Sequence, residues 1–466
     1  MIKTDDIEQQ KIIERIYKEG HQHVFEYWDK LNKKEKSALL NDLSEIDFKL
    51  LNQLIEQHIK NPKIETQKII QPSPITSLPK TKKQKKHRLK ALKKGRKAIL
   101  KGKVAVFLVA GGQGSRLGYN GPKGCFKISP IKKKSLFRLQ AEKILAIQKK
   151  LNTIIPWYIM TSKSNDSQTK RFFKRNKYFG LDSDNIIFFM QKEIPAIDKK
   201  GKLILETKNK IFKNPNGHGG SVLALYESGA LKDIKKRGIK YIFYYQVDNA
   251  LVRMLDPIFI GYHILKKAEM STKIVKKACP EEKVGVIGYV NGKLGVIEYS
   301  DLSKQEMYAK NQNGELKYNA GNIAIHMINV KFVEKLNKTG FMLPYHKAVK
   351  NISTFKGDVE GIKFETFVFD ALNHVKASIT MEVKREDEFA PVKNKDGVDS
   401  PKTAHDMQVN MHARWLEYCK INIPRDQNKI VQGKIEISPL FALDPNQLKR
   451  KLPLNIKFEK GSNISL

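Results

Sequence analysis

The stretch that decides the fold runs from residue 104 to residue 118 and reads Val104-Ala105-Val106-Phe107-Leu108-Val109-Ala110-Gly111-Gly112-Gln113-Gly114-Ser115-Arg116-Leu117-Gly118. Its first six residues are all apolar, which is typical of a strand buried on both faces of a parallel sheet. The glycines that follow allow the backbone to approach a ligand closely and to turn its N–H groups toward phosphate. The segment therefore predicts a buried strand that ends in an anion-binding loop.

Short apolar runs of the same kind recur along the chain, at residues 154–160, 186–190 and 241–247. Segments with helical spacing of their apolar residues lie between them, at 136–149, 168–176 and 221–237. Strands and helices that alternate at this spacing predict an α/β domain with a largely parallel sheet. Beyond about residue 280 the predicted strands are shorter, at 284–290, 295–299 and 323–328, and residues 434–439 predict a small separate β element.

The two ends of the chain have a different texture. Residues 1 to about 60 place apolar residues three and four apart, which predicts amphipathic helices. The proline-containing stretch 71–79 predicts a linker. The run Lys80–Lys103 holds 13 basic residues and no acidic one, and it predicts a helix with a solvated charged face.

The 466 residues carry a formal net charge of +39, from 74 lysines and 13 arginines against 48 acidic residues. A protein that reads nucleic acid is expected to use more arginine, whose planar fork contacts phosphate and guanine with two bonds. Most of the charge is therefore interpreted as compositional, although a basic nucleic-acid-binding protein stays a distant alternative. No stretch of about 18 apolar residues predicts a membrane span. Three widely spaced cysteines fit a reducing compartment, so we expect a cytoplasmic protein.

Two cations accompany the glycine-rich loop, Arg116 within it and Lys123 in the following Gly121-Pro122-Lys123-Gly124. The loop has neither the Gly-Lys-Ser/Thr ending of a Walker A motif nor the three-glycine spacing of a dinucleotide site, which disfavours a nicotinamide-dependent oxidoreductase. Asp248 follows the run 241–247, at the edge where open α/β sheets bind ligands. From the residues alone, Asp248 caps the next segment or holds a metal ion.

The loop together with Pro122-Lys123-Gly124 resembles the eukaryotic-type UDP-sugar pyrophosphorylases, and most of all those that make UDP-N-acetylglucosamine. Further motifs match in the order of the family along essentially the whole chain. They are Phe25-Glu26-Tyr27-Trp28, Pro156 to Ser162, Pro215-Asn216-Gly217-His218-Gly219-Gly220, Gln246-Val247-Asp248-Asn249, Asn319 to Ile323, Phe367 to Asp370, Arg385 to Asn394, and Ile437-Ser438-Pro439.

The resemblance implies a central Rossmann-like, mostly parallel mixed sheet of the nucleotide-diphospho-sugar transferase type. It implies three domains: a helical N-terminal domain with a Lys-rich linker at 1–100, a catalytic domain at 101–400 and a small β-rich domain at 401–466. The implied reaction joins UTP and a sugar 1-phosphate to give UDP-sugar and pyrophosphate. It depends on Mg²⁺, with Mn²⁺ as an alternative ion.

The resemblance also implies roles for individual residues. It assigns charge stabilisation to Arg116, Lys123 and Lys393, and the metal ion to Asp248, whose hard carboxylate suits Mg²⁺. It assigns the nucleotide to Ala110, Gly111, Gly112, Gln191, Gly217 and His218. Among these, Gln191 suits the uracil edge because its side-chain amide can both donate and accept hydrogen bonds. It assigns the sugar to Gly285, Glu298, Asn322, Phe367 and Phe369. Since Phe367 and Phe369 alternate at strand period, one of them alternatively belongs to the core.

Three residues depart from the family pattern. His218 stands in place of an asparagine, Ile325 stands where an Asn-His pair usually begins, and Gln246 replaces a small residue. We interpret these departures as the mark of a bacterial-type subgroup. N-acetylglucosamine 1-phosphate is the favoured sugar substrate, with glucose 1-phosphate as the alternative, and the galactose-type sugars and the oligomeric state are left open.

Overall fold

The computed structural model describes residues 1–61, 68–338, 343–453 and 456–466. These residues form two compact units, each of which is described by itself. Unit 1 comprises residues 1–68, 191–221 and 343–368, and unit 2 comprises residues 69–190, 222–342 and 369–466. None of the described helices is both long enough and apolar enough to cross a membrane.

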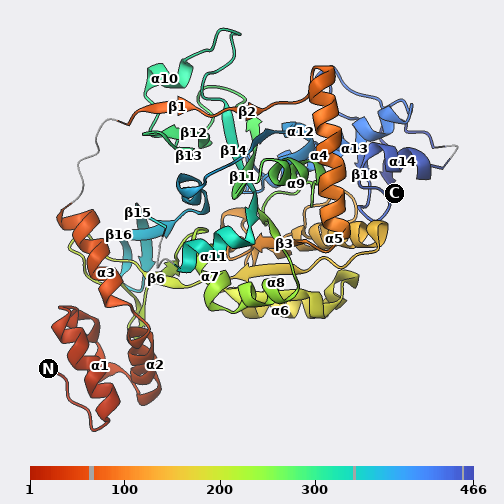
Figure 1. Cartoon of the computed structure of the whole chain (residues 1–466). Coiled ribbons are helices and arrows are strands. Elements are labelled where there is room, and N and C mark those ends of the chain that lie inside the picture. Colours follow the sequence, from red (N-terminus) through yellow and green to blue (C-terminus); the bar gives the residue numbers. More distant parts are fainter. Residues whose placement is uncertain (62–67, 339–342, 454–455) are drawn as a thin grey trace. The chain divides into compact units, whose positions relative to one another are not determined.

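Unit 2 is built on a mixed sheet that has eleven strands within the described residues (Figure 1). Its main path has the order β2-β17-β11-β14-β10-β3-β4-β5, and β1, β12 and β13 extend it at one side. Neighbours from β10 to β5 are parallel, whereas β14 runs antiparallel to both β10 and β11. The strands are β1 (Ile70–Pro72), β2 (Ile75–Thr76), β3 (Val104–Val109), β4 (Trp157–Thr161), β5 (Ile186–Met190), β10 (Tyr241–Gln246), β11 (Met270–Lys276), β12 (Val286–Val290), β13 (Lys293–Ile297), β14 (Ala320–Asn329) and β17 (Thr380–Glu382). The predicted α/β class with a mostly parallel mixed sheet is confirmed.

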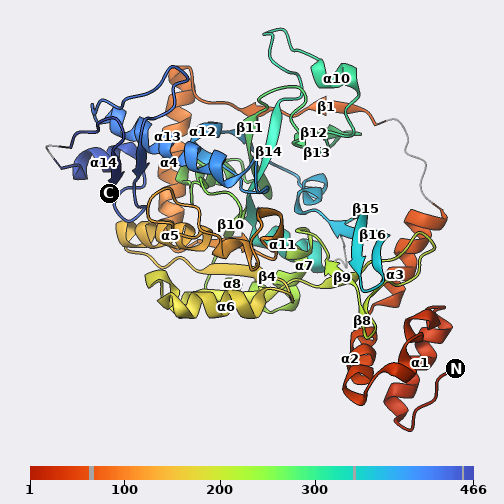
Figure 2. The same ribbon diagram turned by 180° about the vertical axis from the view of Figure 1, so that it is seen from behind.

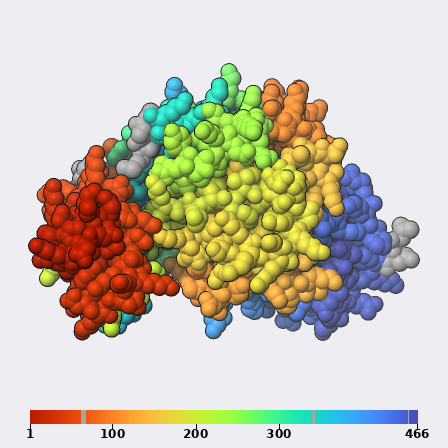
Figure 3. Space-filling view, turned by 90° about the horizontal axis from the view of Figure 1, so that it is seen from below, coloured from red at the N-terminus to blue at the C-terminus, as the bar shows by residue number. Residues whose placement is uncertain are grey.

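Helices cover both faces of the central strands. The face that contains Val106, Trp157 and Phe243 shares one apolar core with residues of α4, α5, α6 and α9. On the other face the ring of Phe107 lies 5.1 Å from that of Tyr244, and the Tyr158 hydroxyl donates to Asp233 of α8. In Figure 3 the yellow residues around α6 adjoin the light-green residues around α8. The helices of this region are α4 (Lys82–Leu100), α5 (Leu136–Leu151), α6 (Asp166–Arg175), α7 (Gly220–Glu227), α8 (Ala230–Lys236), α9 (Pro257–Leu265), α10 (Lys304–Tyr308), α11 (Val330–Lys338) and α12 (Arg385–Glu388).

The Lys-rich run does form a helix, α4, and most of its buried residues are small. Ala91, Gly95 and Ala98 are buried, whereas the flanking Leu89 and Leu100 are exposed. α4 lies along α9 (Figure 1), and a Cβ on Gly95 would overlap the carbonyl of Pro257. A Cβ on Gly261 of α9 would likewise overlap the carbonyl of Ala91. The two backbones therefore touch, which only glycine permits at these two positions.

The stretch predicted as a linker forms two edge strands instead. Residues Ile70–Pro72 pair antiparallel with β12, and Ile75–Thr76 pair parallel with β17. Prolines are compatible with this arrangement because an edge strand has one side without ladder hydrogen bonds. The predicted single helix at 221–237 is also divided, into α7 and α8, at Ser228 and Gly229.

Unit 1 combines the N-terminal helices with two later segments. Its core places Leu39 and Leu51 of the helices with Ile211 and Phe364 of the strands. The three sequential domains predicted at 1–100, 101–400 and 401–466 thus differ from the compact units, because the helices bury their apolar faces on strands far along the chain. The elements are α1 (Ile7–Lys18), α2 (Lys33–Ser44), α3 (Phe48–Ile55), β6 (Glu193–Pro195), β7 (Leu205–Thr207), β8 (Lys210–Ile211), β9 (Lys213–Pro215), β15 (Tyr345–Thr354) and β16 (Gly357–Thr366).

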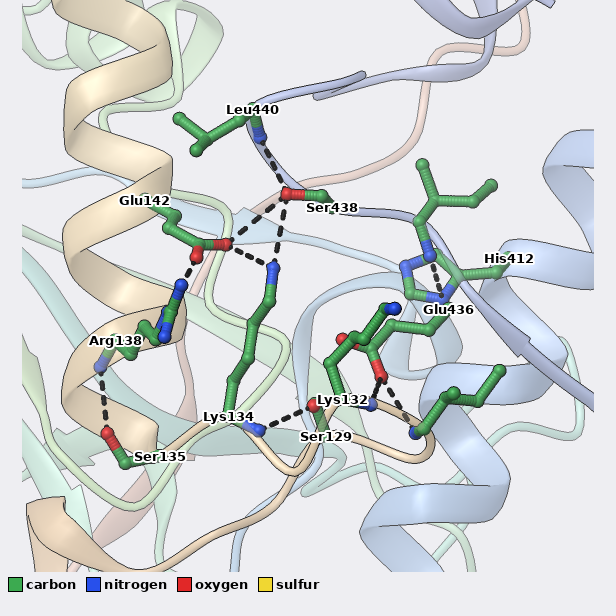
Figure 4. A network of polar contacts seen from close by, with 12 residues as sticks. Ser129, Lys132, Lys134, Ser135, Arg138, Glu142, His412, Glu436, Ser438 and Leu440 are labelled. Atoms are coloured by element: carbon green, nitrogen blue, oxygen red, sulfur yellow. Dashed lines mark hydrogen bonds and ion pairs between the residues drawn. The ribbon is translucent and has the colours of Figure 1, made fainter. Parts of the chain in front are cut away.

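The C-terminal segment is part of unit 2 and has a small core of its own around Leu416, Ile435 and Leu448. A polar network attaches it to α5 and to the loop before that helix (Figure 4). Glu142 of α5 accepts from Lys134 at 2.7 Å and from the Ser438 hydroxyl at 3.3 Å. The elements are α13 (Pro401–Tyr418), β18 (Lys434–Glu436), α14 (Pro445–Lys451) and β19 (Asn463–Ser465). The C-terminus lies close to α14 (Figure 2).

Candidate active site at the carboxyl edge of the sheet

The glycine-rich loop is held from behind by two buried polar side chains. It starts at Ala110, whose N–H donates to the carbonyl of Met160 at 2.8 Å. The Asn165 amide donates to the carbonyls of Ala110 (2.9 Å) and Gly112 (3.3 Å), and the Ser162 hydroxyl donates to the carbonyl of Gly111 (2.8 Å). Three consecutive carbonyls are thus engaged by protein donors.

This anchoring leaves the front of the loop available to an anion. Within the described part of the chain, the N–H groups of Gly111 and Gly112 make no hydrogen bond. A Cβ on Gly112 would meet no protein atom within 4 Å, so open space lies beside it. Arg116 lies in the short 3-10 turn Ser115–Leu117, is exposed, and forms no ion pair with any described residue. Free backbone donors beside an unpaired guanidinium favour a phosphate ligand.

Lys123 and Asp248 lie together at the same edge. The N–H of Val247 donates to the carbonyl of Val109 at 3.1 Å, which aligns the end of β10 with the end of β3. Asp248 follows directly, and its Oδ2 lies 3.9 Å from Nζ of Lys123. The Lys123 side chain is 16% exposed and the Asp248 side chain 15%. The pair is therefore sheltered and still accessible to a small ligand.

A second segment is clamped against Asp248 through its neighbour Asn249. The Asn249 side chain donates to the carbonyl of Glu388 at 2.7 Å and accepts from the N–H of Ala390 at 3.0 Å. The carbonyl of Asp248 itself accepts from the N–H of Val392 at 3.0 Å. Lys393 is thereby brought next to the backbone of Asp248. Its ammonium, however, pairs with Asp399 at 3.2 Å.

Below this segment lies a buried charged cluster. Lys273 is fully buried, and its Nζ lies 2.9 Å from Asp256 and 2.5 Å from Glu388. Burial raises the pKa of Glu388, although the lysine opposes this effect. The pKa of Asp256 is held well below its usual range by the Lys273 and Arg253 charges, which outweigh its own burial. The cluster thereby fixes the backbone at Glu388, whose carbonyl accepts the hydrogen bond from Asn249.

Three predicted sugar-site residues of unit 2 lie together. The N–H of Asn322 donates to the carbonyl of Gly285 at 2.9 Å. A Cβ on Gly285 would lie 3.4 Å from both carboxylate oxygens of Glu298. The Asn322 amide oxygen accepts from the N–H of Ala324 at 3.0 Å, so its amide nitrogen is the group left to donate to a ligand.

Four predicted residues belong to unit 1. The buried Gln191 has an amide oxygen with no partner among the described residues, which makes it a free acceptor. Burial lowers the pKa of His218 to about 4, and its Nδ1 accepts from the N–H of Val368 at 3.2 Å. The ring of Phe367 lies 5.3 Å from that of His218 and stacks on His346 at 4.7 Å.

The structure gives Gly217 a second explanation and corrects the interpretation of the two phenylalanines. Gly217 has a φ of +84°, and a Cβ there would overlap the backbone of Thr366, so the protein's own packing requires this glycine whether or not a ligand approaches. Phe367 and Phe369 do not alternate along a strand, because β16 ends at Thr366 and a 3-10 turn begins at Val368. Val368, the residue between them, is the one in the core.

The residues that anchor the site were not singled out from the sequence. Asn165, Gln140 and Lys143 are polar residues within helices or loops, and nothing in the local pattern distinguishes them from solvent-facing ones. Ser162 and Asn249 do lie in quoted family motifs, so those motifs could have identified them.

Comparisons with known proteins identify the family. The profile of UTP–glucose-1-phosphate uridylyltransferase (UDPGP) matches residues 47–416. UDP-N-acetylglucosamine diphosphorylase 2 of Arabidopsis thaliana is 40% identical over 93% of this chain and 89% of its own. UDP-N-acetylglucosamine pyrophosphorylase of Saccharomyces cerevisiae is 37% identical over 85% of this chain and 89% of its own. The crystal structure of the Trypanosoma brucei uridine diphosphate N-acetylglucosamine pyrophosphorylase with an inhibitor superposes with a TM-score of 0.83, at 30% identity, over 97% of this chain and 96% of that one.

These relatives are eukaryotic, so the interpretation of His218, Ile325 and Gln246 as marks of a bacterial-type subgroup is not supported. The resemblance to the family itself is confirmed over nearly the whole length. This chain belongs to the UDPGP family of UDP-sugar pyrophosphorylases, which are nucleotidyltransferases.

Proposed function

We propose that this protein transfers the uridylyl group of UTP to N-acetylglucosamine 1-phosphate, giving UDP-N-acetylglucosamine and pyrophosphate. The observation that carries the proposal is the arrangement at one sheet edge: an anchored glycine-rich loop with free N–H groups beside the Lys123–Asp248 pair. The names of the relatives support the same sugar. Glucose 1-phosphate is the second candidate, because the matching family profile bears the name of that reaction.

The donor set at Asp248 fits Mg²⁺. Among the described residues, no group of three or more His, Cys, Asp or Glu side chains is arranged to hold a metal ion. Mg²⁺ does not need such a cage, because it commonly takes one or two carboxylates and completes its shell with substrate phosphates and water. Asp248 would hold the ion, and when bound the ion would neutralise phosphate charge and align the nucleotide.

The chain's own residues then have defined tasks. The loop at 110–112 of unit 2 would bind the nucleotide through its free N–H groups. For Gln191, a residue of unit 1, we propose only the nucleotide contact that the family resemblance implies. Arg116 and Lys123 would stabilise the phosphates, each being expected to contribute about 10²-fold to the rate. Lys393 would join them after release from Asp399, because its backbone is already fixed beside Asp248.

The chemistry requires no general base. A phosphate oxygen of the sugar phosphate is already ionised at neutral pH and forms a bond to the α-phosphorus of UTP. The bond from that phosphorus to the oxygen bridging the α- and β-phosphates breaks, and pyrophosphate leaves with its electron pair. The protein therefore acts by aligning two polyanions and offsetting their repulsion.

In the sugar site, Glu298 would accept from paired hydroxyls, and Asn322 would donate its amide N–H to the acetamido oxygen. Phe369, in the same unit, would provide an apolar wall for the acetyl methyl group, and for Phe367 of unit 1 we propose only the sugar contact that the family resemblance implies. A cytoplasmic setting accords with the three cysteines, which are all free thiols. UTP and the sugar phosphate are the partners we propose, rather than a nucleic acid, since the basic residues of α4 form the solvated surface of a helix whose Ala91, Gly95 and Ala98 are packed in the protein.

The test is an assay of pyrophosphate release from UTP and Mg²⁺ with each of four sugar 1-phosphates: N-acetylglucosamine, N-acetylgalactosamine, glucose and galactose. We expect kcat/KM to be highest for N-acetylglucosamine 1-phosphate. A preference for glucose 1-phosphate of more than about tenfold, or roughly 1.4 kcal/mol, would overturn the sugar assignment alone. Absence of pyrophosphate release with every sugar would overturn the uridylyltransferase itself.

A further inference from the structure

Two side chains of α5 bind the carbonyls on both sides of Asp248. Gln140, which is 1% exposed, donates to the carbonyl of Val247 at 3.0 Å. One turn later, Nζ of Lys143 donates to the carbonyls of Ala250 and Val252, both at 2.9 Å. The carbonyl of Asp248 itself is taken by Val392. Four of the six carbonyls from residue 247 to residue 252 are thus fixed.

The lysine is an unexpected choice for packing alone. Burial lowers the pKa of Lys143 to about 7, and no carboxylate among the described residues lies within ion-pair distance of it. Desolvating an ammonium is costly, and a leucine or methionine would fill the same space between helix and loop at lower cost. What an apolar side chain lacks is the ability to donate to two carbonyls at once.

The helix that carries both donors is itself fixed. The Tyr245 hydroxyl donates to the amide oxygen of Gln140 at 3.2 Å, which sets the direction of its amide nitrogen. Between the two donors, Glu142 binds Lys134, Arg138 and Ser438 (Figure 4). α5 therefore connects the segment around Asp248 to the C-terminal part of unit 2 through short polar contacts on two of its sides.

We infer that Gln140 and Lys143 are positioning residues for Asp248: Gln140 fixes the peptide plane that precedes it, and Lys143 fixes the loop that follows it through the carbonyls of Ala250 and Val252, so that its carboxylate is presented in the orientation that catalysis needs. Neither residue touches substrate in this scheme. The inference rests on the proposed function, since it assigns the two residues to the same reaction. A catalytic group must be held within about half an ångström of its productive geometry, and a loosely held group is a much weaker catalyst.

The decisive variant is Lys143→Met, which keeps the unbranched stem and removes the donors. We expect kcat to fall at least tenfold while the KM for the sugar phosphate stays within about twofold. Lys149→Met is the matched control, because Lys149 lies on the same helix and is exposed; its kinetic constants should equal those of the parent. Lys143→Gln, which retains one N–H donor pair, should recover part of the loss.

A readout independent of turnover is the binding of Mn²⁺ in the presence of UTP, followed by loss of the free-ion EPR signal. Lys143→Met should weaken it at least fivefold. Gln140→Met provides a second variant if Lys143→Met does not fold, as judged by its melting temperature, and should act in the same direction.

A double-mutant cycle separates positioning from a general structural role. Adding Lys143→Met to Asp248→Asn should cost little further activity if the lysine acts through Asp248. Additive losses in the cycle, or unchanged kcat and Mn²⁺ binding in Lys143→Met, would overturn the inference. An inactive parent enzyme would instead overturn the proposed function, so the two failures are distinguishable.

Discussion

Replacing Asn165 with alanine tests whether the glycine-rich loop depends on its buried anchor. Asn165 is fully buried and makes three hydrogen bonds: to the carbonyls of Ala110 and Gly112, and from the N–H of Ser162 at 2.9 Å. A hydrogen bond contributes about 1 kcal/mol net, and a buried group left without a partner costs about 1–3 kcal/mol. Ala110 is 2% exposed, so water cannot easily replace the lost donor there, whereas Gly112 is exposed. We therefore expect Asn165→Ala to lower the free energy of unfolding by about 3 kcal/mol.

The same change should weaken UTP binding at least tenfold, because the loop N–H groups are no longer held in one orientation. Urea denaturation measures the first effect and isothermal titration with UTP the second. Asn176→Ala is a suitable control, since Asn176 donates one side-chain hydrogen bond, to the Phe172 carbonyl, at a helix end away from the loop. It should cost about 1 kcal/mol and leave UTP binding unchanged. If Asn165→Ala lost less than about 1 kcal/mol and bound UTP normally, the loop would not depend on this anchor.

Three further predictions concern the metal, the charge and the pH dependence. Asp248→Asn keeps the side-chain shape but removes the charge, so turnover at limiting Mg²⁺ should fall at least 10²-fold with the melting temperature preserved; near-normal turnover would refute the metal assignment. Replacing five lysines between Lys82 and Lys94 by glutamine should leave kcat within a few-fold at 0.15 M salt, where exposed charges are screened beyond about 8 Å; a large salt-independent loss would place α4 in the site. Burial lowers the pKa of His412 to about 4, so between pH 4 and about 6.5 this histidine is protonated in the unfolded state and neutral in the folded state. The free energy of unfolding should therefore fall as the pH is lowered from about 6.5 to 4. His412→Gln should lower the number of protons taken up on unfolding by up to about one, as measured from denaturation curves recorded across this pH range.

The central sheet could be predicted because its strands carry their own pattern. The apolar runs at 104–109 and 186–190 coincide with β3 and β5, and 241–247 differs from β10 by one residue. A strand buried on both faces needs no partner to be identified. The edge strands Ile70–Pro72 and Ile75–Thr76 lacked such a pattern, because they are short and flanked by prolines, and their pairing is decided by distant strands.

The discontinuity of unit 1 could not be predicted for a related reason. The apolar faces of its N-terminal helices indicate that something must cover them, but not that Ile211 and Phe364 do so from more than 150 residues away. Periodicity reports which face is buried, whereas the identity of the partner is a property of the tertiary structure.

For the candidate site, the sequence predicted the residues that lie at the sheet edge better than the residues that hold them in place. The loop, Lys123 and Asp248 are at a strand end, where ligands bind in such sheets, and the structure places these two side chains 3.9 Å apart. Lys143 could not be predicted, because a lysine on a helix is normally solvated and this chain has 74 of them. Gly217 had a plausible role from its motif, yet its positive φ and the nearby Thr366 backbone account for it independently.

The contact between α4 and α9 has an evolutionary consequence. On its inner side, α4 cannot accept a single added carbon at Gly95 without separating the two helices, so every substitution of this glycine is expected to be destabilising. On its outer side, positions such as Lys86 and Lys90 are exposed and tolerate almost any soluble residue. Substitutions must therefore accumulate on one side of the helix only. Lysines on the outer side add to the net charge of +39 without altering the packed side of the helix.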